Sequence, residues 1–218
     1  MENEVSFANA EFHKKPVYEC IKRIFDVLVA LIAIVVLSPV LLGISLAIYL
    51  EDHGPILYRA QRVGRGGKPI TVYKFRSMRL NADRLEDMLT PQELVEYHRN
   101  YKLKHDPRVT KVGAFLRKTS LDELPQLFNI LAGQLSMVGP RPVLQEETEL
   151  YGDKRELLLS CKPGLTGLWQ TSGRSNVNYE NGARQQLELE YVRDRGLWLD
   201  TKILFRTVGA VVRQDGAR

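Results

Sequence analysis

The hydrophobic residues of this chain gather in one long segment near the N-terminus. From Val27 to Leu50 there is no charged residue. A straight helix of this length would extend about 36 Å, enough to cross a hydrocarbon core of roughly 30 Å. The segment is too long for a signal peptide, and no small-residue cleavage pattern follows it. The pattern therefore predicts a membrane helix.

Two features favour a re-entrant hairpin over a membrane span. Ser38 and Pro39 lie mid-segment, where proline removes a helical hydrogen bond and a serine hydroxyl can pair with freed backbone groups. Lys and Arg flank both ends, which the positive-inside rule assigns to the cytoplasm; they are Lys14, Lys15, Lys22 and Arg23 before, and Arg59, Arg62, Arg65 and Lys68 after. A single span is the alternative. Asp26 lies four residues after Lys22, so the two could pair at the membrane edge. The alternative is that Asp26 is an ordinary interfacial charge.

Alternation with period two predicts two short strands beyond this segment. They run from Ile56 to Gln61 and from Ile70 to Phe75, with the glycine-rich turn Val63 to Lys68 between them. Lys74 and Arg76 point to one side of the second strand and aromatic residues to the other. The two cations are either a basic stripe beside a bound anion or part of an ordinary solvated face.

Helical spacing accounts for most of the remaining chain. The expected helices are 81–88, 91–100 after a capping box of Thr90 and Glu93, 146–159, 179–194 and 197–212. The last is amphipathic, with Leu204, Val208, Val211 and Val212 on one face and Trp198 near its start. It suits either the membrane interface or packing on the protein core.

The net charge indicates the class of partner, and the cysteines give no sign of a metal site or a disulfide framework. The chain has 218 residues, a net charge of +5 and a pI near 9.2. This balance favours an anionic partner, such as a phosphate-bearing substrate, acidic lipid or nucleic acid. The two cysteines, Cys20 and Cys161, form neither a metal-ligand spacing nor a disulfide framework.

An adjacent acid pair, Asp122 and Glu123, is the main candidate for chemistry. Ser120 and Glu123 have the spacing of a capping box, and Pro125 is expected in the first turn of the helix that follows. That helix carries an apolar stripe of Leu124, Leu127, Phe128 and Leu131 and stops at Gly133. One carboxylate could act as a covalent nucleophile while its neighbour holds Mg²⁺. The alternative is that both simply cap the helix and favour its dipole.

Arginines near the acid pair are candidate phosphate ligands. Arg117 lies five residues before Asp122, and Arg141 stands between two prolines that fix the backbone around it. A later loop, Lys162 to Gln170 followed by Gly173, Arg174 and Ser175, is rich in turn formers and suits a binding loop.

Taken together, these motifs resemble the bacterial sugar transferases, also called monotopic phosphoglycosyl transferases. The resemblance covers nearly the whole chain after about Tyr18. Its matching pieces are Lys22-Arg23-x-x-Asp26, Ser38-Pro39, Tyr73 to Met78, Leu116 to Gln126, Ser136 to Pro142 and Lys162 to Gly167.

The resemblance implies an enzyme that transfers a sugar-1-phosphate from a UDP-sugar to undecaprenyl phosphate and releases UMP. Asp122 would be the nucleophile in a ping-pong mechanism, and Glu123, together with Asp122, would hold Mg²⁺. The residues themselves add five candidate substrate ligands, which are Lys74, Arg76, Arg117, Arg141 and Arg174. Lys22, Arg23, Asp26, Ser38 and Pro39 match the family's re-entrant motif. The C-terminal section is more similar to members that act on UDP-galactose or UDP-glucose.

The expected fold is α+β and mostly helical. Residues 1–52 would form a tail and a re-entrant membrane helix-break-helix. Residues 53–218 would form a compact cytoplasmic catalytic domain with a small β-hairpin and interfacial amphipathic helices. The expected location is the cytoplasmic face of the bacterial inner membrane, with membrane lipid and a second copy of the chain, as a homodimer, as further candidate partners.

Two other functions stay open from the residues themselves. A Mg²⁺-dependent UDP-sugar hydrolase would use water in place of the lipid. A non-catalytic basic membrane module would bind acidic lipid or nucleic acid, but the chain lacks the clustered Lys/Arg run of such modules, so no nucleic-acid partner is expected.

Overall fold

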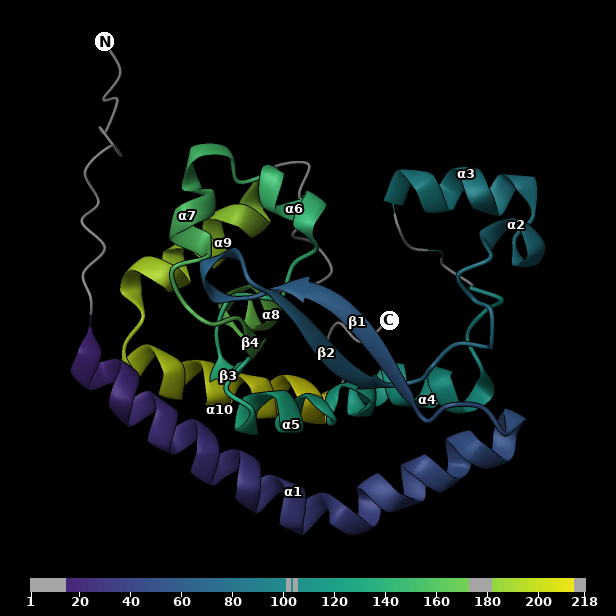
Figure 1. Ribbon diagram of the computed structural model, residues 1–218, viewed down its shortest axis with the longest axis horizontal. Helices are drawn as coiled ribbons and strands as arrows, with labels where there is room; N and C mark the ends of the chain where they lie inside the picture. The colour runs from purple at the N-terminus through teal and green to yellow at the C-terminus, as the bar shows by residue number, and fades with distance from the viewer. Residues whose placement is uncertain (1–14, 101–102, 104–105, 173–181, 214–218) are drawn as a thin grey trace.

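The computed structural model describes residues 15–100, 103, 106–172 and 182–213, and these form a mostly helical α+β fold (Figure 1). The α-helices are α1 Pro16–Asp52, α2 Leu85–Met88, α3 Pro91–Asn100, α4 Lys111–Thr119, α5 Gln126–Leu131, α6 Gln145–Glu149, α7 Arg155–Leu158, α8 Leu168–Thr171, α9 Ala183–Asp194 and α10 Leu197–Arg213. The strands are β1 Leu57–Val63, β2 Pro69–Phe75, β3 Ser136–Val138 and β4 Gly164–Thr166, and three 3₁₀ turns are η2 Arg65–Gly67, η3 Leu121–Glu123 and η4 Gly152–Lys154. The predicted fold class is confirmed at this level.

Helix α1 is the one described helix long and apolar enough to cross a membrane, judged by length and composition. It is bent in its middle, and both arms rise toward the rest of the molecule (Figure 1). The helix continues through Pro39, so the predicted break is a bend within one helix. The Ser38 hydroxyl donates to the Val35 carbonyl at 2.7 Å. That is the carbonyl whose helical partner Pro39 removes, as the sequence led us to expect.

The predicted hairpin is confirmed. β1 and β2 pair antiparallel from Leu57↔Phe75 to Val63↔Pro69, and Gly66 and Gly67 have positive φ in the turn. One face of the hairpin forms a core with α1 and α5, made by Ala30, Ala60, Ile70, Val72, Leu127, Ile130 and Leu135. The hairpin therefore lies over α5, which in turn lies on α1 (Figure 1).

A second, smaller sheet lies beside the C-terminal helices. β3 and β4 are parallel, with Ser136 opposite Gly164 and Val138 opposite Thr166. Val138 packs with residues of α8, α9 and α10 in a core of Val138, Leu168, Tyr191, Val192 and Ile203.

Two stretches are less helical than predicted. In 81–88 only α2 is helical, and Asn81, the first residue of the predicted helix, has a positive φ of 63°. The predicted helix 146–159 is divided into α6, η4 and α7, and Gly152, the first residue of η4, has a φ of 51°. Asparagine and glycine tolerate this left-handed geometry, which a regular α-helix does not contain, so Asn81 lies outside the helix and Gly152 interrupts it.

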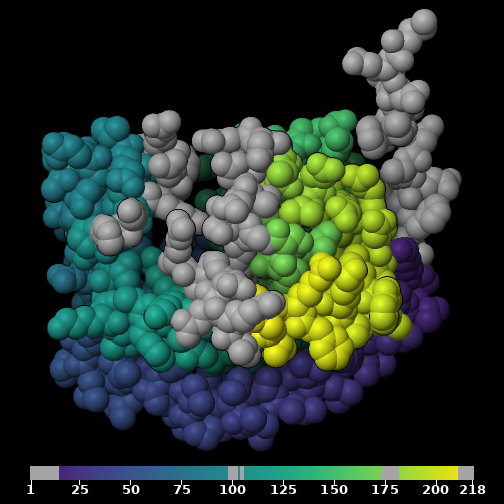
Figure 2. All heavy atoms as spheres, turned by 180° about the vertical axis from the view of Figure 1, so that it is seen from behind, coloured from purple at the N-terminus to yellow at the C-terminus, as the bar shows by residue number. Residues whose placement is uncertain are grey.

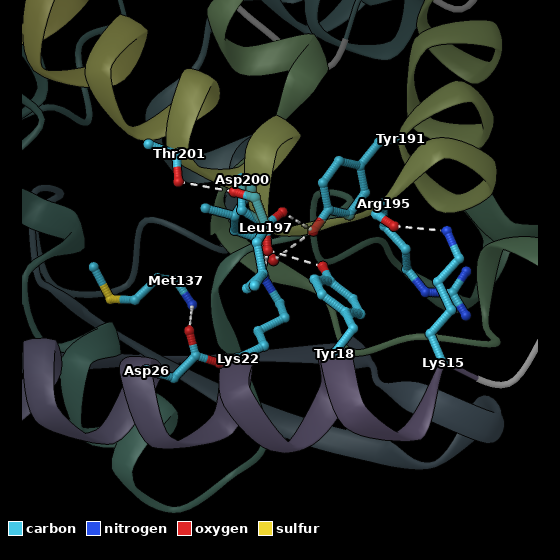
Figure 3. Close-up of polar contacts among 11 residues, drawn as sticks. Lys15, Tyr18, Lys22, Asp26, Met137, Tyr191, Arg195, Leu197, Asp200 and Thr201 are labelled. Carbon is cyan, nitrogen blue, oxygen red and sulfur yellow. Dashed lines mark hydrogen bonds and ion pairs between the residues drawn. The ribbon is translucent and has the colours of Figure 1, made fainter.

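Charged side chains of α1 attach it to the domain above (Figure 3). Lys22 donates to Asp200 at 2.5 Å, and Asp26, which is 3% exposed, accepts the backbone N–H of Met137 at 2.9 Å. The expected Lys22–Asp26 pair was therefore wrong. Arg23 donates to the carbonyls of Ile130 and Leu131 at the end of α5.

Asp200, in the first turn of α10, joins three elements (Figure 3). It accepts hydrogen bonds from Lys22 and Tyr18 of α1 and, at 2.8 Å, from Tyr191 of α9. Burial and the Asp200 charge hold the pKa of Tyr191 well above its ordinary value, so its hydroxyl remains a donor.

Asp200→Asn is expected to lower the free energy of unfolding by about 2 kcal/mol, because the charge that three donors share is lost. For a chain of this size that corresponds to roughly 4–8 °C in Tm. Thermal unfolding in detergent measures it, with Asp194→Asn, an exposed aspartate at the end of α9, as the matched control. An unchanged Tm in the Asp200 variant would contradict the anchoring role.

Apolar side chains remain exposed on α1 and α10; in the view from behind, α1 forms the lower edge of the molecule and α10 lies above it (Figure 2). Only Asp26, Ala30, Ile44 and Ile48 of α1 are buried, while Leu28, Ile32, Val36 and Leu42 are each more than half exposed. On α10, Ile203 is fully buried but Trp198 and Phe205 are 81% and 75% exposed. One face of α10 thus packs on the core, and another is left apolar and uncovered.

Candidate active site

The acid pair lies on a tight connection between two helices. α4 ends at Thr119, and Ser120 follows at φ 57°, with its N–H bonded to the Arg117 and Leu116 carbonyls. Asp122 and Glu123 then form the 3₁₀ turn η3, and Pro125 precedes α5. The predicted capping box was wrong, because the Ser120 side chain makes no cap hydrogen bond. Gly133, at φ 77°, does end α5 as predicted.

Two cations flank the acid pair. Lys74 of β2 lies 3.3 Å from a Glu123 carboxylate oxygen, with both side chains partly exposed. Arg117 of α4 donates from Nε to the Ser77 hydroxyl at 2.9 Å, and its charge is close enough to Asp122 to affect the pKa of that carboxyl. Of the residues predicted to bind substrate, Lys74 and Arg117 are therefore brought to the predicted nucleophile.

Burial and neighbouring charges have opposing effects on the pKa values of Asp122 and Arg117. Burial and the neighbouring Glu123 charge raise the pKa of Asp122, while Lys74 and Arg117 oppose the rise. Burial lowers the pKa of Arg117, and the Asp122 charge opposes that change. A partly desolvated carboxylate whose ionised form is favoured by two nearby cations is well suited to attack an electrophilic phosphorus.

Other predicted substrate ligands lie elsewhere. The Arg76 guanidinium is 9% exposed; it donates to both oxygens of Asp52 and, at 2.6 Å, to the Pro55 carbonyl. These contacts hold the C-terminal end of α1. Arg174 lies outside the described residues. Arg141 is half-buried, with its guanidinium 5.6 Å from the centre of the Trp169 ring.

Sequence reasoning missed Glu188, a carboxylate on α9 that contacts the segment carrying Arg141. Its Oε2 accepts the backbone N–H of Arg141 at 3.0 Å, and the residue is 1% exposed. Tyr18, Tyr191 and Asp200 were missed in the same way. The contacts of Glu188 with Arg141 and of Tyr18 with Asp200 join residues 47 and 182 positions apart, so no local spacing could indicate them.

A pH dependence of stability is expected from Glu188. Burial raises its pKa from 4.5 to about 7, against the opposing effects of the Arg141 N–H and the Arg184 and Arg141 charges, while Glu147 adds to the rise. Between these values the folded protein binds a proton that the unfolded chain releases, so stability falls as pH rises from about 4.5 to 7. Melting curves between pH 5 and 8 should therefore show a smaller decline for Glu188→Gln than for the wild type. Parallel profiles would contradict the assignment.

Comparison with known proteins gives the family. The model of the bacterial sugar transferase family matches residues 17–214. An undecaprenyl-phosphate galactose phosphotransferase of Salmonella typhimurium is 46% identical over 200 residues, which cover 90% of this chain and 41% of the relative. The exopolysaccharide production protein ExoY of Sinorhizobium fredii is 44% identical over 206 residues, which cover 93% of this chain and 90% of the relative.

A third relative, the UDP-glucose:undecaprenyl-phosphate glucose-1-phosphate transferase of Escherichia coli, is 41% identical over 194 residues, covering 86% of this chain and 39% of the relative. The chain spans about two fifths of the length of the Salmonella and Escherichia relatives. The family match extends over α1, the hairpin, the acidic turn and α10. The chain belongs to the bacterial sugar transferase family.

Proposed function

We propose that this protein transfers a sugar-1-phosphate from a UDP-sugar to undecaprenyl phosphate, with release of UMP, as a first membrane step of glycoconjugate assembly. The observation that carries the proposal is the Asp122 carboxylate beside Glu123, with Lys74 and Arg117 as its charged neighbours. Relatives named for galactose and glucose phosphate transfer favour UDP-galactose or UDP-glucose as donor.

The reaction would proceed in two displacements. A carboxylate oxygen of Asp122 attacks the β-phosphorus, the bond from that phosphorus to the bridging oxygen breaks, and UMP leaves with this oxygen. A phosphate oxygen of the lipid then attacks the same phosphorus. The acyl phosphate bond breaks, which restores the Asp122 carboxylate and leaves the sugar on a lipid diphosphate.

Lys74 and Arg117 would assist both displacements through their positive charges. Lys74 and Arg117 are close enough to Asp122 to oppose the rise in its pKa, so they favour the ionised, nucleophilic form. The same charges would offset the negative charge of an incoming pyrophosphate, which otherwise repels a carboxylate.

The acidic turn suits Mg²⁺. Asp122 and Glu123 offer two carboxylates, and within the described part of the chain no group of three or more His, Cys, Asp or Glu side chains gathers. Two carboxylates completed by phosphate oxygens and water are a set that Mg²⁺ prefers. When bound, the ion would neutralise pyrophosphate charge and make UMP a better leaving group.

A panel of UDP-sugars tests the proposed function. UMP release is measured with Mg²⁺ and undecaprenyl phosphate, with parallel reactions that omit the lipid or contain EDTA. The proposal requires release with at least one sugar that depends on both lipid and metal. Lipid-independent release would identify a hydrolase, and no release with any sugar would refute the proposed activity.

For the membrane, we propose that α1 enters one leaflet and returns, with the catalytic domain at the cytoplasmic face. Both arms of α1 rise toward the same side of the molecule (Figure 1), and polar contacts hold both ends to the domain. A straight span would break the contact of either Lys22 with Asp200 or Arg76 with Asp52.

Cysteine labelling in spheroplasts is expected to place both flanks of α1 in the cytoplasm. The native Cys20, which is exposed, reports one flank in a Cys161→Ser background, and Arg59→Cys reports the other when Cys20 and Cys161 are both replaced by serine. A membrane-impermeant maleimide should label neither until the membrane is opened. Labelling of one flank in intact spheroplasts would establish a span instead.

A further inference from the structure

Trp169 lies against two arginines from different parts of the chain. Its ring is 8% exposed, with the Arg184 guanidinium carbon 4.4 Å and the Arg141 guanidinium carbon 5.6 Å from its centre. Both distances are within the range in which an aromatic face attracts a cation. Trp169 belongs to α8 and Arg184 to α9, which pack together, while Arg141 follows β3.

The two arginines differ in what neutralises them. Arg184 pairs with Glu147, with 3.7 Å between nitrogen and oxygen. Among the described residues, the Arg141 guanidinium has no hydrogen bond or ion pair; only its backbone N–H is used, by Glu188. Arg141 thus keeps its full set of side-chain donors while the ring of Trp169 fixes where they lie.

The backbone of Arg141 is fixed as firmly as its side chain. Pro140 and Pro142 restrict the chain on both sides. Glu188, itself buried, accepts the single N–H between them, and its second carboxylate oxygen has no hydrogen-bond partner among the described residues. A buried carboxylate with one hydrogen bond is costly to stability, and positioning the Arg141 segment is a use that explains it.

We propose that Trp169 and Glu188 are positioning residues that hold Arg141 ready to bind a phosphate group of the nucleotide sugar. This inference rests on the proposed function for the identity of the ligand. It adds two residues that do not themselves touch substrate. Trp169 directs the guanidinium through its ring, and Glu188 sets the backbone from which that guanidinium extends.

A double-mutant cycle with a binding readout tests the proposal. The dissociation constant of UDP is measured by calorimetry for the wild type, Trp169→Leu, Arg141→Ala and the double variant, with inorganic pyrophosphate as a second probe. Loss of Arg141 should weaken UDP binding about tenfold or more, and Trp169→Leu about threefold to tenfold. In the Arg141→Ala background the Trp169 change should have almost no further effect.

Conservative variants guard against a purely structural role. Trp169→Phe keeps a ring and should bind UDP more tightly than Trp169→Leu, while Glu188→Gln keeps an acceptor for the Arg141 N–H and should bind more tightly than Glu188→Leu. Trp198→Leu, at the exposed tryptophan of α10, is the matched control and should leave binding unchanged. If Trp169→Leu does not fold, the double-mutant cycle is made with Trp169→Phe and Arg141→Ala instead.

The outcomes separate the two proposals. Equal losses from the Trp169 change in both Arg141 backgrounds, or UDP binding that Arg141→Ala leaves intact, would overturn the positioning role. UDP binding that shows the expected coupling in a protein that releases no UMP from any donor would support the positioning role and reject the proposed activity.

Discussion

Asp122→Asn is expected to reduce lipid-dependent UMP release by about 10⁴-fold or more, since it removes the nucleophile while keeping the shape of the side chain. The protein should fold as well as the wild type. Burial and the Glu123 charge raise the pKa of Asp122, so its ionised form is held at a cost that a neutral amide does not carry. We therefore expect an unchanged or slightly higher Tm together with the loss of activity.

The covalent step gives this prediction a second readout. With a UDP-sugar labelled in the sugar and no lipid acceptor, wild-type protein should retain label after denaturation, and the Asp122 variant should retain none. Asp83→Asn, an exposed aspartate before α2, is the matched control and should behave as the wild type does. Full UMP release by Asp122→Asn would falsify the aspartyl intermediate.

The acidic turn shows where local sequence rules succeed and where they fail. Thr90 and Glu93 form the predicted capping box, because the Glu93 carboxylate accepts the Thr90 N–H and the Thr90 hydroxyl accepts the Glu93 N–H. Ser120 and Glu123 have the same spacing but no such box. An N-cap needs extended backbone, whereas Ser120 closes α4 in the left-handed region, so the preceding helix overrides the motif.

Polar contacts between distant parts of the chain could not be predicted from the sequence either. The motif of Lys22, Arg23 and Asp26 was recognisable, but its partners are in α5, β3 and α10, more than 100 positions away in the chain. The strand pattern put Arg76 on the same face as Lys74, but it could not show that Asp52, 24 positions earlier, binds the Arg76 guanidinium. Periodicity identifies which face of an element is polar, but which distant element meets that face depends on the tertiary packing.

Gly139→Ala is expected to lower the free energy of unfolding by about 3 kcal/mol or more and to impair nucleotide binding as well. A Cβ at Gly139 would lie 2.6 Å from the Gly164 nitrogen and 2.6 Å from the Lys162 carbonyl oxygen. Both are backbone atoms, so no side-chain rotation can relieve the contact. Two hydrogen bonds of 2.8 Å cross the same place, from Gly139 to Thr166 and from Gly164 to Pro140.

The consequence for binding follows from the position of Gly139, two residues before Arg141. Moving the two strands apart would shift Pro140 and strain the hydrogen bond from Arg141 to Glu188. We therefore expect a Tm lowered by roughly 6–12 °C and weaker UDP binding in whatever folded protein remains. Gly43→Ala is the matched control, because a Cβ there meets nothing within 4 Å and alanine favours the helical conformation. A Tm of Gly139→Ala equal to that of the wild type would contradict this prediction. It would mean that β3 and β4 separate at little cost, so that Arg141 is not held as firmly as the positioning role requires.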